Sequence, residues 1–181
     1  MKAAAGLFAI CLFIAFGMAV AAAKEPSYAG SGSCRECHER FYQLWSTSMH
    51  GLAMQPYTKS FAMAKLTPHQ GDIAIGKATY RADIVKGVVI ETDRGGTRRF
   101  QIEHVLGGKN VYYFLTPLDK GRLQTLPVAY DVHKKEWFDT AASGIRHFPG
   151  GGRGEAVDWR HYSYTFNTAC YSCHVSQLDT N

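Results

Sequence analysis

The pattern Cys-x-x-Cys-His occurs twice in the chain, at residues 34–38 and at residues 170–174, and these copies contain four of the five cysteines. The pattern is typical of covalent c-type haem attachment. Two thiols three positions apart reach the two vinyl groups of one porphyrin, and the adjacent histidine binds the iron. We therefore expect two covalently attached haems, with Cys34, Cys37, Cys170 and Cys173 as attachment residues and His38 and His174 as iron ligands.

Paired cysteines also occur in three other kinds of site. A four-thiolate zinc site usually separates its pairs by about 15 to 20 residues, whereas 132 residues lie between Cys37 and Cys170. A thioredoxin-like dithiol lies beside a βαβ pattern, and none is visible around either pair. Two disulfides could form after export, but they would not need a histidine after each pair. The histidines therefore favour haem.

The first 23 residues have the pattern of a secretory signal peptide. After Lys2 the chain carries no charge before Lys24, and three alanines follow the apolar run at residues 7–20, as at an A-x-A cleavage site. An uncleaved membrane anchor is the alternative, because the uncharged stretch is just long enough to span a bilayer. We expect cleavage, and hence a periplasmic or otherwise exported protein that meets a membrane only if this segment stays attached. Cys11 is read as an apolar residue of the signal.

Cleavage would leave 158 residues, a length that suits one domain. The expected parts are a signal peptide at 1–23, an N-terminal haem-binding segment at 24–77, an antiparallel β segment at 78–140 and a C-terminal haem-binding segment at 141–181. The predicted fold class is α+β, with short helices around two c-type haem sites that flank a small antiparallel β segment.

The residues after the first motif predict a helix. Ser33 is the expected N-cap, and Phe41, Leu44, Trp45 and Met49 recur at helical spacings. One face of this helix should cover the first haem or the protein core.

The middle of the chain predicts β-hairpins, because short runs rich in valine, isoleucine and aromatic residues alternate with turn sequences. The turn sequences are Lys86-Gly87, Gly95-Gly96, Gly107-Gly108 and Asp119-Lys120-Gly121. Phe100, Ile102, His104 and Leu106 alternate with Arg99, Gln101, Glu103 and Val105, which predicts one strand with one buried face. The glycine-rich residues 150–154 predict a loop.

Haem iron that only transfers electrons is normally six-coordinate, with a second histidine or a methionine as ligand. A continuous helix from His38 to His50 would separate the two residues by about 18 Å along its axis. They could not then bind one iron, so His50 is predicted to bind the other haem, unless it only flanks a helix end. His147 and His161 are candidates for the first haem, and Met54 is an alternative that would raise the potential.

Charge limits the partners. The net charge is +5, and haem propionates would offset much of it, some of them through Arg35 or Arg40 beside the first motif. No long basic run with interleaved aromatic residues occurs, so nucleic acid is not an expected partner. The expected partners are redox proteins, including a larger multihaem complex.

A wider arrangement of motifs connects the two haem signatures. In chain order it comprises Cys34-x-x-Cys37-His38, Trp45-x-x-Ser48-x-His50, Gly121-Arg122-Leu123-Gln124, Lys135-Glu136-Trp137-Phe138 and Cys170-x-x-Cys173-His174. This arrangement resembles the multihaem c-type cytochromes related to the tetrahaem electron carrier of hydroxylamine oxidation. The resemblance covers most of the mature chain. It implies closely packed haems and a distal ligand role for His50. Family members usually carry further motifs, so it also implies a piece of a longer protein or a part of a larger assembly.

These observations predict an exported dihaem cytochrome that carries single electrons between redox partners and is not itself a catalyst. The alternative is a haem enzyme or enzyme subunit that reduces a small nitrogen or sulfur oxyanion at an open-coordination haem. In that case Arg146, His147 or His161 could line a polar distal pocket. A sensor module is a third class, which no appended output domain supports.

Overall fold

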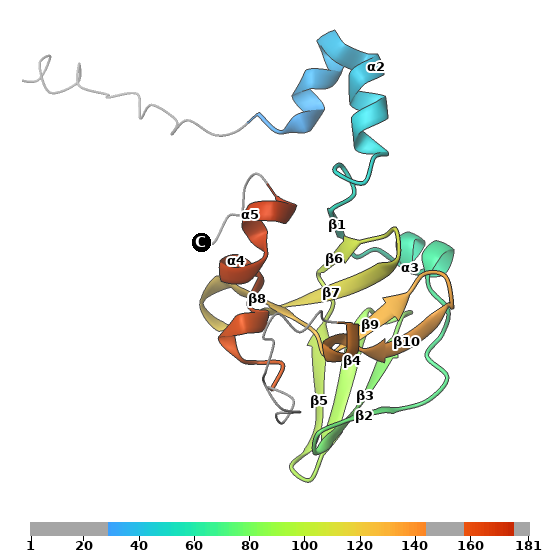
Figure 1. Ribbon diagram of the computed structural model, residues 1–181, viewed down its shortest axis with the longest axis vertical. Coiled ribbons are helices and arrows are strands. Elements are labelled where there is room, and N and C mark those ends of the chain that lie inside the picture. The colour runs from blue at the N-terminus through green and yellow to red at the C-terminus, as the bar shows by residue number, and fades with distance from the viewer. Residues whose placement is uncertain (1–28, 144–157, 176–181) are drawn as a thin grey trace, which may run out of the picture. The chain divides into compact units, whose positions relative to one another are not determined.

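The computed structural model describes residues 29–143 and 158–175 (Figure 1). The chain forms two compact units, Met1–Glu39 and Arg40–Asn181. The predicted signal peptide and the glycine-rich loop at 150–154 lie outside the described residues. Within the described ranges, no helix is long and apolar enough to cross a membrane.

The first motif begins in the 3-10 helix η1 (Ser31–Cys34), which leads into helix α2 (Arg35–Ser46). The prediction of Ser33 as N-cap is wrong, because its hydroxyl donates back to the carbonyl of Gly30 (2.8 Å) inside the preceding turn. The helix is also interrupted, since the backbone of His38 leaves helical geometry (φ −130°, ψ 45°).

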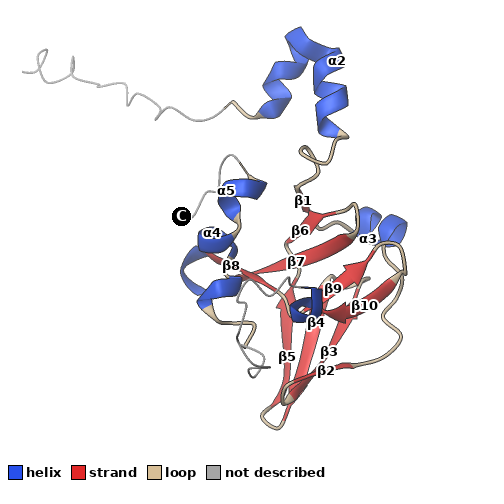
Figure 2. Ribbon diagram, in the orientation of Figure 1, coloured by secondary structure: helices blue, strands red, loops and turns tan. Residues whose placement is uncertain are grey.

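Strands of the second unit form two antiparallel sheets (Figure 2). The six-stranded sheet has the order β1-β6-β7-β9-β10, and β8 pairs with β7. Its strands are β1 (Met54–Pro56), β6 (His104–Gly107), β7 (Val111–Leu118), β8 (Arg122–Thr125), β9 (Val128–Asp131) and β10 (Glu136–Asp139). The four-stranded sheet has the order β2-β3-β4-β5. Its strands are β2 (Ile73–Ile75), β3 (Ala78–Asp83), β4 (Val88–Asp93) and β5 (Gly96–Gln101).

Helices of the second unit are short. Helix α3 (Lys59–Lys65) has Thr58 as N-cap, whose hydroxyl oxygen accepts a hydrogen bond from the Phe61 backbone N–H (3.1 Å). Such a bond satisfies one of the free amides at a helix start. The other helical segments are η2 (Asp119–Gly121), η3 (Thr140–Ser143), η4 (Tyr162–Tyr164), α4 (Phe166–Ala169) and α5 (Tyr171–His174).

The main core contains residues of both sheets, including Val89 of β4, Phe114 of β7 and Tyr130 of β9, all fully or almost fully buried. Strand β7 buries side chains on both of its faces. Phe114 lies in this main core, whereas the next residue, Leu115, belongs to a second apolar cluster. Successive residues of a strand point to opposite faces, so the second cluster lies on the outer face of the six-stranded sheet.

The antiparallel hairpins are confirmed, and the predicted turn sequences lie at the ends of strands or between them. At two of them glycine permits the positive φ of the turn, 65° at Gly87 and 83° at Gly107. The β structure is larger than the predicted small segment, because β1 and β2 precede residue 78. The single strand predicted at 99–106 is wrong: β5 ends at Gln101, and β6 begins at His104 in the other sheet.

Candidate haem-attachment sites

The second motif lies on a turn with regular backbone hydrogen bonds. Cys170 ends α4 and precedes α5, and its carbonyl accepts from the Cys173 N–H (3.3 Å). The Val175 N–H in turn donates to Tyr171 (2.9 Å). This helical turn brings two thiols three positions apart, with His174 next to the second, which is the spacing that haem attachment requires.

An apolar cluster supports this turn. We call it the outer cluster, and its buried members are Leu106, Leu115, Leu123 and Phe166. Cys170, Val175, Met54 and Tyr113 are partly buried against it. Phe166 is fully buried and begins α4 (Figure 1). One end of the motif is therefore packed on apolar side chains of the sheet, while Cys173 is exposed.

Buried Gln124 of β8 connects the segment before the motif to the six-stranded sheet. Its amide nitrogen donates to the carbonyls of Trp159 (2.6 Å) and His161 (3.1 Å), and its amide oxygen accepts from the Thr165 hydroxyl (2.8 Å). Asn167 adds a further connection, because its side-chain oxygen accepts from the Leu123 N–H (2.6 Å). These bonds fix the chain on both sides of Phe166.

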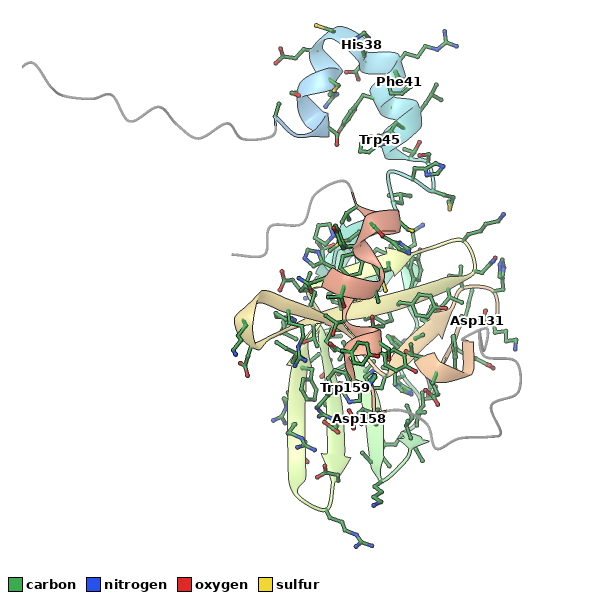
Figure 3. The ribbon with its side chains drawn as sticks, turned by 60° about the vertical axis from the view of Figure 1, so that its left-hand side comes forward. His38, Phe41, Trp45, Asp131, Asp158 and Trp159 are labelled. Carbon is green, nitrogen blue, oxygen red and sulfur yellow. The ribbon has the colours of Figure 1, made fainter. Side chains whose placement is uncertain are left out.

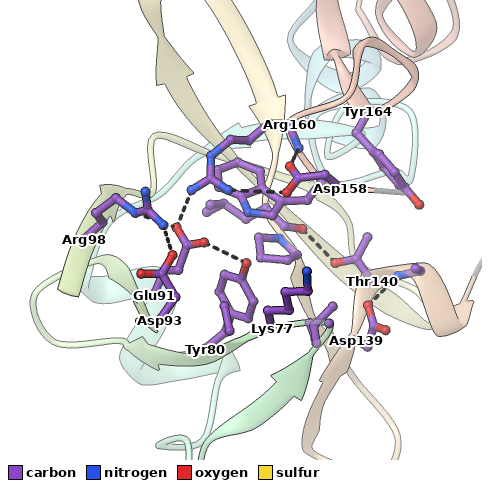
Figure 4. A pocket seen from close by; sticks show the side chains of 17 residues that line it. Lys77, Tyr80, Glu91, Asp93, Arg98, Asp139, Thr140, Asp158, Arg160 and Tyr164 are labelled. Atoms are coloured by element: carbon purple, nitrogen blue, oxygen red, sulfur yellow. Dashed lines mark hydrogen bonds and ion pairs between the residues drawn. The ribbon is translucent and has the colours of Figure 1, made fainter. Parts of the chain in front are cut away.

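A buried carboxylate connects the same segment to the four-stranded sheet (Figure 4). Glu91 of β4 is 2% exposed and pairs with Arg160 and with Arg98 (3.3 Å). It also accepts from the Tyr80 hydroxyl (3.0 Å). Burial, followed by this hydrogen bond, raises the pKa of Tyr80 to about 12, so its hydroxyl stays a donor. The segment that precedes the second motif is thus bonded to both sheets.

The side chains of the second motif fit a c-type haem. His174 contacts Phe166 (ring centroids 6.3 Å apart), and its Nδ1 atom is buried without a hydrogen-bond partner in the described part of the chain. Iron would bind the other ring nitrogen, Nε2, so the fit rests on the donor set of two thiols and an imidazole on one turn. Burial, and then the neighbouring Cys173, raises the pKa of the Cys170 thiol. A thioether bond to haem would remove that titration.

The first motif has a more exposed environment. Cys34, Cys37 and His38 are all exposed, and Arg35 forms an ion pair with Glu39 one turn later (2.8 Å). Both thiols are free, as are those of the second motif. The donor set of this turn suits haem attachment in the same way, because the thiols are three residues apart and the imidazole follows directly.

The predicted apolar face of α2 is present but not covered. Phe41 is 68% exposed and Leu44 is 66% exposed, and no residue of α2 is buried. Figure 3 labels Phe41 and Trp45 on this helix. The apolar face of α2 therefore does not cover the protein core in the described structure. Covering a haem stays a prediction.

The structure removes the basis for assigning His50 to the other haem. That assignment needed a continuous helix from His38 to His50, but α2 is interrupted at His38 and ends at Ser46. His50 lies in a turn beyond the helix, with its side chain exposed. The rise of about 18 Å along one axis therefore does not apply. His50 stays a predicted axial ligand, but its haem is not assigned by this argument.

Hydrogen bonds distinguish the remaining histidines. His69 and His161 each accept a backbone N–H at Nδ1, from Ala82 (2.9 Å) and Ser163 (3.3 Å). A neutral ring that accepts at Nδ1 carries its proton on Nε2, so neither ring offers Nε2 to a metal. His133 contacts Asn110 through Nε2 (3.1 Å). The His50 ring has no hydrogen bond within the described residues, and His147 lies outside them, as does Arg146.

The alternatives to haem gain no support from the described residues. All four motif cysteines are free, so the structure has no disulfide between them. No group of three or more histidine, cysteine, aspartate or glutamate side chains is arranged as a metal site in the parts that the structure describes.

Gln124, Asn167, Glu91 and Arg160 were not identified from the sequence. Gln124 is the last residue of the motif Gly121-Arg122-Leu123-Gln124, so the sequence marked its position, but nothing in the sequence indicated which groups its side chain binds. The other three carry no local signal for this role, because the bonds that attach the segment are long-range: Asn167 lies 44 residues from Leu123, and Arg160 lies 69 residues from Glu91.

Residues 33–82 match the model of a family described as cytochrome c554 and c-prime. The match includes the first motif, α2, His50 and the chain as far as β3. It supports a c-type cytochrome with covalently bound haem and a role in electron transfer. The second motif lies outside the matched range. No curated protein and no solved structure matches the chain.

Proposed function

We propose that this chain is an exported dihaem c-type cytochrome that carries single electrons between redox protein partners. The observation that carries the proposal is the second motif. Its thiols and histidine lie on one hydrogen-bonded turn whose first cysteine packs against the outer cluster. The family match supports the first motif independently.

In this proposal each motif holds one haem, through Cys34 and Cys37 or through Cys170 and Cys173. His38 and His174 are the proposed iron ligands, and His50 and His147 are candidates for the further axial positions. A bound haem iron takes up and releases one electron, with a potential set by its ligands and burial. The protein fixes the position of each haem and excludes water from part of its edge.

The wider setting belongs to the same proposal. We propose that the signal peptide at 1–23 is removed and that the protein works in the periplasm or an equivalent exported location. The relation to the tetrahaem carrier of hydroxylamine oxidation and a place in a larger multihaem complex rest on the resemblance of motifs.

The test is the visible spectrum of the reduced, exported protein before and after addition of carbon monoxide. Mass spectrometry first counts the attached haems. Two haems whose low-spin bands ignore carbon monoxide are expected, because six-coordinate iron has no open position. A haem that binds carbon monoxide in the unmodified protein would contradict the carrier proposal and favour the enzyme.

His50→Ala tests the proposed ligand. We expect one haem of this variant to bind carbon monoxide. His133→Ala is the matched control, because His133 is exposed and its ring contacts Asn110, and it should leave both haems unchanged. Unchanged low-spin spectra in His50→Ala would remove His50 from the ligand set.

A further inference from the structure

The proposed function leaves open which side chain binds the second haem opposite His174. The structure places a methionine at the outer cluster. Met54 of β1 pairs with Leu106 of β6, and Leu106 pairs with Tyr113 of β7. Cross-strand partners point to the same face of a sheet, so these three side chains form a row on the outer face.

The same cluster packs against the second motif. Met54, Cys170 and Val175 are all partly buried against it, although Met54 precedes Cys170 by more than a hundred residues. The other methionines of the mature chain have different environments: Met49 is 55% exposed and Met63 is 62% exposed. Met54 is thus the methionine that the fold brings to the apolar surroundings of the second motif.

Two histidines compete for the role. His104 pairs with Leu115 and so has the same outward register, but its Nε2 contacts the Glu103 carboxylate (3.1 Å). That contact makes Nε2 a hydrogen-bond donor rather than a free ligand atom. His50 lies only four residues before Met54, yet its side chain is exposed in a turn.

We propose that the Sδ atom of Met54 is the second axial ligand of the haem attached at Cys170 and Cys173, opposite Nε2 of His174. This inference rests on the proposed function, because it needs haem at the second motif. Thioether sulfur is a soft, uncharged ligand, and histidine-methionine ligation raises the potential of a haem. If the first haem has two histidine ligands, the second haem would have the higher potential and would hold the electron in the half-reduced protein.

The experiment uses the full chain with Cys34→Ala and Cys37→Ala, which retains only the second haem. Met54→Leu in this background keeps an apolar side chain of similar size. We expect its haem to gain carbon monoxide binding and its midpoint potential to fall. Met63→Leu is the matched control and should change neither property. His50→Ala in the same background should also leave this haem closed.

A second measurement needs no substitution. With methionine methyl groups isotopically labelled, the reduced protein should show one methyl resonance strongly displaced by the haem ring current, and its assignment should be Met54. This result supports the proposal even if Met54→Leu fails to fold. Absence of a displaced methionine methyl overturns it, as does a Met54→Leu haem that keeps its potential and ignores carbon monoxide.

Two further outcomes separate this inference from the proposed function. If His50→Ala opens the second haem and Met54→Leu does not, His50 is the ligand, and the inference alone is wrong. If the unmodified protein carries no haem at Cys170 and Cys173, by mass of the C-terminal peptide, the dihaem proposal fails and the inference fails with it.

Discussion

Replacing Gln124 with methionine removes the hydrogen bonds that attach the segment before the second motif to the six-stranded sheet. Methionine retains the length of the side chain but cannot donate or accept comparably. The carbonyls of Trp159 and His161 then lose their donor, and the Thr165 hydroxyl loses its acceptor. The His161 carbonyl is only partly buried, so water can replace its lost donor in part. A lost bond is worth about 1 kcal/mol net, and an orphaned buried group costs about 1 to 3 kcal/mol. We expect the free energy of unfolding to fall by about 3 to 4 kcal/mol.

Thr165→Val provides an internal scale for this prediction. It removes only the bond from Thr165 to Gln124 and leaves the buried Oε1 of Gln124 without its donor, so it should cost about 1 to 3 kcal/mol. Urea unfolding of the haem-loaded protein, followed by circular dichroism, measures both losses from the midpoint at an unchanged m-value. Gln70→Met is the control, because Gln70 is exposed and should change stability by about 0.5 kcal/mol or less.

A second readout tests the location of the effect. Hydrogen exchange of backbone amides at residues 159–170 should become faster in Gln124→Met, because the segment loses its bonds to β8, while amides of the main core keep their order of protection. The reasoning is refuted if Gln124→Met costs no more than Thr165→Val, or if the exchange of this segment is unchanged.

Two further predictions use the same unfolding assay. Glu91→Gln should lower the free energy of unfolding by about 2 to 4 kcal/mol, because partly buried Arg160 loses its counter-ion. Asp158→Asn should lower it by about 0.5 kcal/mol or less, since Asp158 is exposed and lies 3.8 Å from the Arg160 guanidinium. Equal losses would contradict the role of burial. Burial lowers the pKa of His69 in the folded protein. The unfolded chain therefore binds more protons below about pH 6.5. As the pH falls from about 7 to 5, the free energy of unfolding of the wild-type protein should decrease relative to that of His69→Asn. Parallel stability curves of these two proteins would contradict this prediction.

Local chemistry made part of the fold predictable. Glycine at the turns has a specific backbone reason, as the positive φ of Gly87 and Gly107 shows. The Cys-x-x-Cys-His pattern likewise needs only one helical turn, so its local geometry follows from the sequence. These features depend on residues within a few positions of one another.

The division into two sheets could not be predicted from the same pattern. The period-two pattern predicted one strand from 99 to 106, yet Ile102 and Glu103 form a link between β5 and β6. The Ile102 N–H donates to Gly87 (2.8 Å), whereas the Glu103 N–H donates to Leu115 of the other sheet (2.8 Å). Alternation records which side chains are buried, not which strand supplies the hydrogen bonds. Long-range pairing decided the outcome.

The arrangement of the second site suits electron transfer, because an electron carrier works best when its iron ligands and surroundings move little on a change of oxidation state. The motif is packed on the outer cluster, and the segment before it is bonded to Gln124 in one sheet and to Glu91 in the other. Displacement of residues 159–165 would therefore break hydrogen bonds to both sheets. The first motif is exposed, and burial is one of the factors that set a haem potential. The two Cys-x-x-Cys-His motifs therefore have different environments in the described structure, and under the proposed function their haems would differ in potential.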